Sequence, residues 1–96
     1  MEADLLDEVR QAFQVDTQTS ILRLREAINE RDAEKYRDQL LTIRSAAATL
    51  GAAHLAVLCD QGGEYYPPAL ELQGRILLQR VEAEVQRVDE QLGAVK

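Results

Sequence analysis

The chain has 96 residues, of which 46% are hydrophobic and 29% charged, a composition typical of one small folded domain and not of a disordered chain. Its formal net charge of −6 argues against nucleic acid and anionic membrane surfaces as partners, and no apolar run approaches the ~18 residues of a membrane-spanning helix. The one cysteine excludes an internal disulfide and fits a reducing cytosol, so we expect a single cytoplasmic domain over residues 1–96.

Helical spacing of apolar residues begins at the N-terminus and predicts two helices in the first third of the chain. The first is expected over residues 2–13, and Asp16 is a plausible N-cap for a second over about 17–30, because its carboxylate can accept the amide hydrogens of a first turn. The inward-facing residues are predicted to be Leu5, Leu6, Val9 and Phe13 in the first helix and Ile21, Leu24 and Ile28 in the second.

A tight joint at Arg31-Asp32 separates these helices from a third, which is expected over about 33–50 with Asp32 as its N-cap. Gly51 follows this helix and can adopt the left-handed conformation that ends one. The spacings of 4, 3, 4 and 3 in its apolar stripe are typical of a helix packed in a bundle. This stripe consists of Tyr36, Leu40, Ile43, Ala47 and Leu50.

The last part of the chain is predicted to hold a short fourth helix over about 52–61, stopped by Gly62-Gly63, and a long final helix over about 69–92. The loop Glu64–Pro68 between them is expected to form a lid over the end of the bundle, and a recognition loop at Tyr65–Pro68 is the less favoured alternative. Inward positions are Leu55 and Leu58 in the short helix and Leu70, Leu77, Val81, Val85, Val88 and Leu92 in the long one, where Gly74 would permit close approach of a neighbour. The pattern predicts an all-α antiparallel four-helix bundle with an additional short N-terminal helix.

One segment of the third helix carries a recognisable motif. The run from Leu41 to Ala53 contains Leu50-Gly51-Ala52, and Leu58-Cys59 follows it. This pattern resembles the phosphorylation-site helix of histidine-containing phosphotransfer (HPt) domains of bacterial two-component signalling, which reads His-x-Leu-Lys-Gly, then small residues, Leu-Gly-Ala and Leu-x-x-Leu-Cys. In that register the phosphoacceptor histidine falls on Leu41, the lysine on Arg44 and the glycine on Ser45.

The resemblance implies an HPt scaffold without its chemistry, because leucine cannot carry a phosphoryl group. We therefore expect a non-catalytic module that needs no cofactor and binds a receiver domain, a histidine kinase or another signalling protein through the former phosphoacceptor face. The candidate partner-binding residues are Leu41, Arg37, Arg44, Ser45 and Ala48. Alternatively, Leu41 only widens the apolar face of the bundle and touches a neighbouring helix, or the chain is a structural or dimerisation bundle.

The other reactive side chains give weaker signals. His54, the single histidine, is a less favoured alternative phosphoacceptor, because it would begin a short helix and has Val57-Leu58 where the family has Lys-Gly. Cys59 is expected to be packed in the core and inert. The C-terminal carboxylates are predicted to form a solvated helix surface; they are Glu82, Glu84, Asp89 and Glu90.

The charge is unevenly spread along the chain. Residues 1–16 carry −4, residues 17–50 carry +1 and residues 51–96 carry −3. The segment with the HPt-like motif is therefore the least acidic, which is a mild indication that an acidic partner docks there.

Overall fold

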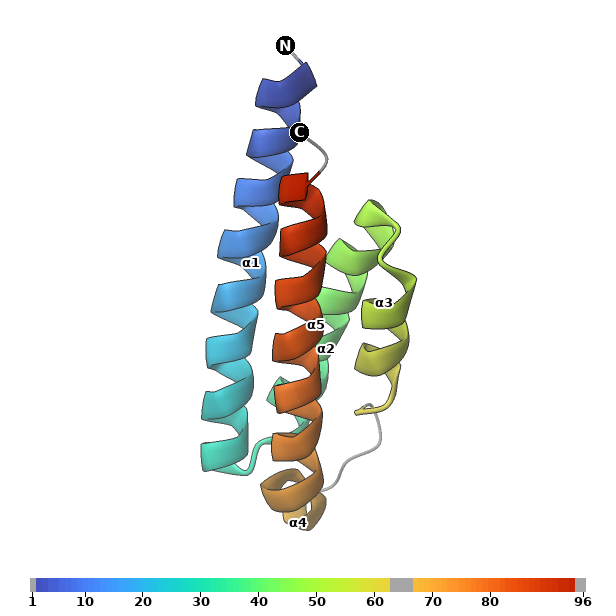
Figure 1. The fold of residues 1–96 in the computed structure, drawn as a ribbon. Coiled ribbons are helices and arrows are strands. Elements are labelled where there is room, and N and C mark those ends of the chain that lie inside the picture. Colours follow the sequence, from blue (N-terminus) through green and yellow to red (C-terminus); the bar gives the residue numbers. More distant parts are fainter. Residues whose placement is uncertain (1, 63–66, 95–96) are drawn as a thin grey trace.

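The structure, a computed structural model, describes residues 2–62 and 67–94, and every regular element in these ranges is helical (Figure 1). The prediction of an all-α fold is confirmed. In chain order the elements are α1 (Glu2–Glu30), α2 (Ala33–Leu50), α3 (Ala53–Asp60), the single turn α4 (Pro67–Ala69), the π-helical η1 (Leu70–Gly74) and α5 (Arg75–Ala94).

The N-terminal third forms one continuous helix, so the predicted break between residues 13 and 17 and the additional short N-terminal helix are wrong. Asp16 lies inside α1 and is not an N-cap. The buried Thr17 does not interrupt the helix, because its hydroxyl donates to the Phe13 carbonyl at 2.6 Å, one turn back. The expected inward face is also partly wrong, since Leu5 is 62% exposed and only Phe13 of that group is buried.

The bounds and both ends of α2 agree with the prediction. The Asp32 side chain accepts a hydrogen bond from the Lys35 amide at 3.0 Å, as expected of an N-cap. At the other end Gly51 adopts φ 73°, and its amide donates to carbonyls of the last turn. Of the predicted stripe only Leu50 is not fully buried.

The C-terminal helix begins earlier than predicted and contains a widened turn. Pro67–Ala69 and the π-turn Leu70–Gly74 run into α5, so Pro67 and Pro68 are helical rather than part of a loop. The buried hydroxyl of Tyr36 donates to the Gly74 carbonyl at 2.9 Å and fixes α2 against this turn. The rest of the predicted lid, residues 64–66, lies outside the described residues.

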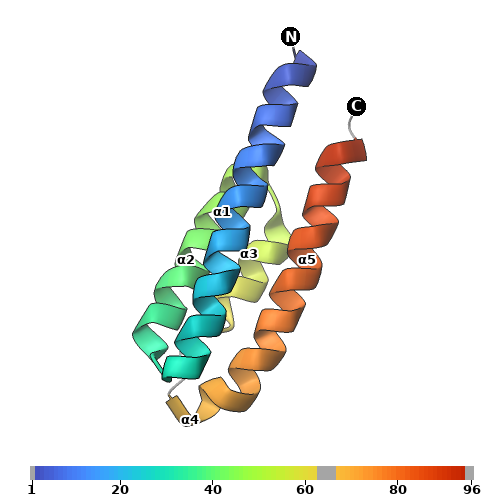
Figure 2. The ribbon, with the colours of Figure 1, turned by 90° about the vertical axis from the view of Figure 1, so that its left-hand side faces the viewer.

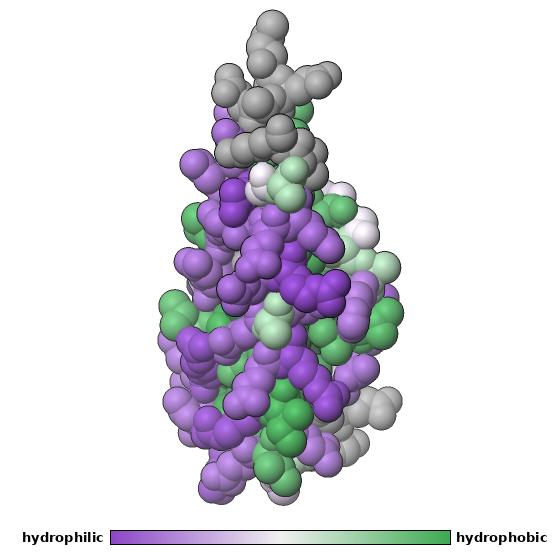
Figure 3. All heavy atoms as spheres, viewed as in Figure 1, coloured by the Kyte–Doolittle hydropathy of each residue, from purple (hydrophilic) through white to green (hydrophobic). Residues whose placement is uncertain are grey.

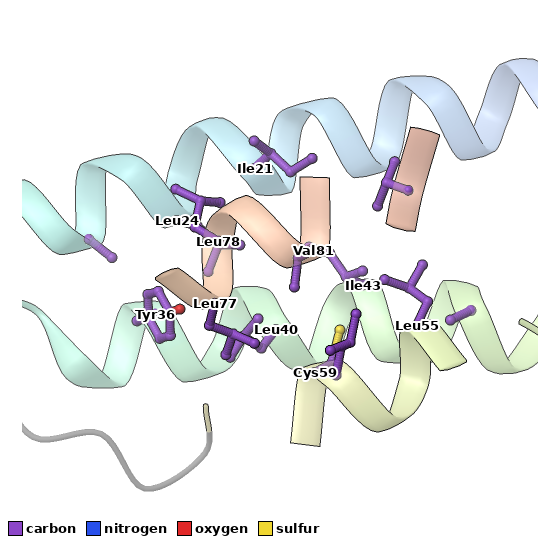
Figure 4. Packing of buried hydrophobic residues seen from close by; sticks show 14 of the residues in the cluster. Ile21, Leu24, Tyr36, Leu40, Ile43, Leu55, Cys59, Leu77, Leu78 and Val81 are labelled. Carbon is purple, nitrogen blue, oxygen red and sulfur yellow. The ribbon is translucent and has the colours of Figure 1, made fainter. Parts of the chain in front are cut away.

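One core joins all the long helices (Figure 4). Ile21 and Leu24 of α1 point towards Leu40 and Ile43 of α2 and towards the α5 side chains. Leu55 and Cys59 close the core from α3. The inward residues predicted for α3, Leu55 and Leu58, are buried. Those predicted for the final helix are buried as well, except Leu92, which is half-buried; the buried ones are Leu70, Leu77, Val81, Val85 and Val88.

Gly74 packs beside Ile28 of α1, in agreement with the predicted close approach, and the most crowded glycine among the described residues is Gly62. A β-carbon on Gly62 would press on the side chains of Leu40 and Leu77, whereas one on Gly74 would meet the neighbouring helix only at 3.7 Å, from Ile28.

The helices pack in a ring in which α1 contacts α2 and α5, and α3 contacts the same two helices. Because α1 has 29 residues and α2 only 18, α1 exceeds α2 by about 16 Å at 1.5 Å per residue. Figure 2 shows the start of α1 and the end of α5 projecting past α2 and α3 at the same end of the molecule. The face over α5 is largely hydrophilic, with small separate apolar patches (Figure 3).

Candidate functional site

The candidate partner-binding residues lie on the outward face of α2. Tyr36, Leu40 and Ile43 form the core side of this helix and are nearly inaccessible to solvent. Leu41 lies about 100° round the helix from Leu40. Leu41 is 50% exposed, and its flanking candidates are exposed as well; they are Arg37, Arg44, Ser45 and Ala48. An apolar side chain with a rim of polar and small residues is a common layout of a protein-binding surface.

Arg44 is held by an ion pair that the sequence did not reveal. Its Nε lies 3.0 Å from Oδ1 of Asp60 at the end of α3. Both side chains are about half exposed, so the pair contributes little to stability, but it orients the guanidinium along the α2–α3 surface. The positive charge that the motif places one turn from Leu41 is therefore partly neutralised by a carboxylate of the same chain.

A second exposed apolar residue, Val57, lies beyond that ion pair. It is 57% exposed and sits one turn before Asp60 in α3. Because α3 runs antiparallel to α2 after the turn at Gly51, Leu41 and Val57 lie on opposite sides of the Arg44–Asp60 pair along the helices. Val57 was not among the predicted residues, because its exposure depends on how α3 docks.

Two threonine hydroxyls of α2 are hydrogen-bonded within the helix. The hydroxyls of Thr42 and Thr49 donate back to the carbonyls of Asp38 and Ser45, at 3.1 and 3.0 Å. Both hydroxyls therefore have hydrogen-bond acceptors within α2, one turn back along the helix.

The two other reactive residues differ in burial. His54 is exposed in the first turn of α3 and makes no hydrogen bond or ion pair with the described residues. Cys59 is buried, as predicted, and burial raises the pKa of its thiol to about 12, with the nearby Asp60 carboxylate acting in the same direction. The thiol therefore stays protonated and weakly nucleophilic.

The C-terminal carboxylates are not merely a solvated surface, because two of them tie α5 to α1. The Arg10 guanidinium donates to both carboxylate oxygens of Asp89, at 3.0 and 3.2 Å, and the Arg25 guanidinium lies 2.7 Å from Glu82. The hydrogen bonds from Arg10 lower the pKa of Asp89. These ion pairs fix the α1–α5 seam away from the Leu41 face.

Among the described residues no group of three or more histidine, cysteine or carboxylate side chains is placed to hold a metal ion. No helix of residues 2–62 and 67–94 combines the length and apolarity needed to cross a membrane. Comparison of the chain with protein-family models, with curated proteins and with solved structures finds no match.

Proposed function

We propose that the chain is a four-helix bundle of HPt type that has lost its phosphoacceptor and works as a protein-interaction module of bacterial two-component signalling. It binds a receiver domain, a histidine kinase or a related signalling protein through the Leu41 face and moves no phosphate. Its effect on the partner is steric or allosteric.

The observation that carries the proposal is the exposure of Leu41. The motif assigns the phosphoacceptor position to this residue, and its side chain is half exposed on the outer side of a well-packed helix. This exposure leaves the Leu41 side chain accessible to a partner. The ring of contacts among α1, α2, α3 and α5 supports the bundle, and the confirmed ends of α2 support the register of the motif.

The test replaces Leu41 with glutamate and uses Leu22→Glu as the matched control. Leu22 has a similar exposed fraction, 56%, on a different helix, so the control introduces the same charge away from the proposed face. Tagged wild-type and variant proteins are used to capture partners from host lysate, and the captured proteins are identified by mass spectrometry. We expect a receiver-containing protein or a kinase to be retained by the wild type and by Leu22→Glu, and lost from Leu41→Glu.

A second experiment tests whether the protein accepts phosphate from its partner in addition to binding it. The captured receiver is phosphorylated with labelled phosphate and incubated with wild-type protein and with His54→Gln. We expect no acid-labile label on either protein. Label on the wild type that disappears in His54→Gln would refute the non-catalytic proposal, and identical capture by all three proteins would refute docking through Leu41.

A further inference from the structure

A groove runs between α1 and α2, and its upper part contains none of the residues of the proposed Leu41 face, whereas its lower part includes Ser45. Its upper part has a volume of about 310 Å³ and is mostly apolar, lined by Val9, Ala12, Phe13, Asp16, Ala46, Thr49 and Leu50. Its lower part, about 380 Å³, shares three of these residues and is lined with hydroxyls from both helices. The two parts therefore form one continuous groove, apolar where α2 ends and polar further along.

The apolar stripe of α1 continues beyond the end of α2. Leu5, Val9 and Ala12 follow one another at spacings of 4 and 3 residues and so share one side of the helix, and Asp16 ends this stripe. Leu5 is 62% exposed and Val9 half-buried, because α1 projects past the last residue of α2. A helix seated in the upper groove would cover this stripe from the side that α2 leaves open.

The start of α1 and the end of α5 form this end of the molecule, and most of the net charge belongs to the two ends of the chain. Residues 2–16 and 84–96 contain eight acidic and three basic residues, which gives −5, whereas the remainder of the chain holds nine acidic and eight basic residues. The stability of the individual helices does not explain this excess of acidic residues. Acids favour the start of α1, but acids near the end of α5 oppose its dipole, and the last turn of α5 contains no basic residue among those described. Asp89 is paired with Arg10, but Glu90 has no cationic partner among the described residues.

This distribution of charge selects the occupant. A second copy of the chain would bring a further −6 against the groove, so self-association at this end is opposed by repulsion. An amphipathic helix with basic flanks would bind favourably in two ways. Its apolar side would cover Val9 and Ala12, and its cations would be attracted to the acidic end of the molecule. We propose that the upper α1–α2 groove docks a basic amphipathic helix of a partner protein, as a second interaction surface separate from the Leu41 face.

The test measures binding of a fluorescent helical peptide, of about 18 residues so that it can fold, with leucine on one side and lysine on the other. A peptide with glutamate in place of lysine is the charge control. Ala12→Arg and Thr49→Arg fill the groove from its two walls and reverse the local charge, and both residues are exposed, so the fold should tolerate them. Gln11→Arg is the control, because it introduces the same charge at an exposed position at least 100° round α1 from Leu5, Val9 and Ala12.

We expect the lysine peptide to bind the wild type, with a Kd raised at least tenfold by either groove variant and less than twofold by Gln11→Arg. Raising the salt concentration should weaken binding, and the glutamate peptide should not bind. Absence of lysine-peptide binding, equal Kd values for all three variants, or binding of the glutamate peptide would overturn the proposal. A wild-type dimer in sedimentation velocity that Ala12→Arg dissociates would also overturn it, because a second copy would then cover the groove. Leu41→Glu should leave peptide binding unchanged, which keeps this test separate from that of the proposed function.

Discussion

Replacing Gly62 with alanine tests the packing of the core at its most crowded point. Gly62 is buried after α3, and a β-carbon there would overlap the Leu40 side chain, lie 2.7 Å from Cδ2 of Leu77 and 3.1 Å from Cε1 of Tyr36. All three side chains are almost completely buried, so none has free space to move into. The substitution therefore overpacks the core.

The magnitude follows from two opposing terms. Forcing an extra methyl group into a packed core costs typically about 1–3 kcal/mol. The φ of Gly62 is not positive, so alanine can adopt its backbone conformation and recovers about 0.4–1 kcal/mol by restricting the unfolded chain. We expect a net loss of about 1–2 kcal/mol in the free energy of unfolding. For a domain of this size each kcal/mol lowers Tm by about 4–8 °C.

Gly51→Ala is the matched comparison, because it should destabilise the fold through backbone strain and not through overpacking. A β-carbon at Gly51 meets nothing within 4 Å, but its φ of 73° strains any L-residue, at a cost of roughly 1–2 kcal/mol. Gly51→Asn should therefore be milder than Gly51→Ala, because asparagine tolerates this conformation better.

Urea denaturation of a double-mutant cycle with Leu77→Ala separates the two mechanisms. Leu77→Ala removes one of the side chains that the new methyl group would strike and leaves a space beside Leu40, so Gly62→Ala should be less destabilising in that background. The cost of Gly51→Ala should be the same with or without Leu77. If Gly62→Ala is equally destabilising in both backgrounds, the overpacking argument is refuted.

Three further substitutions test individual polar contacts. Tyr36→Phe removes a buried hydrogen bond and leaves the Gly74 carbonyl without that donor, so we expect a loss of about 1–2 kcal/mol by urea denaturation. Gln39→Met should stabilise the fold by roughly 1 kcal/mol in the same assay, because its buried Oε1 has no hydrogen-bond partner among the described residues. Asp89→Asn should lower Tm at pH 7. Because the pair with Arg10 lowers the pKa of Asp89 in the folded state, its stabilisation is present above the unfolded pKa of about 4 and is lost as pH falls through the folded pKa.

Each of these predictions has a distinct contradicting result. Equal stability of Tyr36→Phe and wild type would show that the hydroxyl finds no better partner in the fold than in water. A lower Tm for Gln39→Met would mean that the amide oxygen is solvated. A Tm difference between wild type and Asp89→Asn that persists unchanged from pH 7 to about pH 2 would show that the ion pair is not its cause.

The helices and most of their buried faces were predictable because their signals are local. The Asp32 cap, the left-handed Gly51 and the four-and-three spacing from Tyr36 to Ala47 are each read within a few residues, and α2 has the predicted bounds. The same local reading failed at Asp16, where a cap signal lies inside a continuous helix. A local cap preference is worth only about 1 kcal/mol, and packing of α1 against α2 and α5 along its length outweighs it.

The candidate site shows the same division. The sequence by itself determined which residues share the outer face of α2, since Arg37, Leu41, Arg44 and Ala48 follow from helical periodicity. Only the tertiary structure decided that Arg44 is paired with Asp60, that Arg10 and Arg25 join α1 to α5, and that α1 projects past α2 and opens an apolar groove. These features depend on which distant residues the helix lengths and docking bring together, and the spacing along one helix carries no information about that.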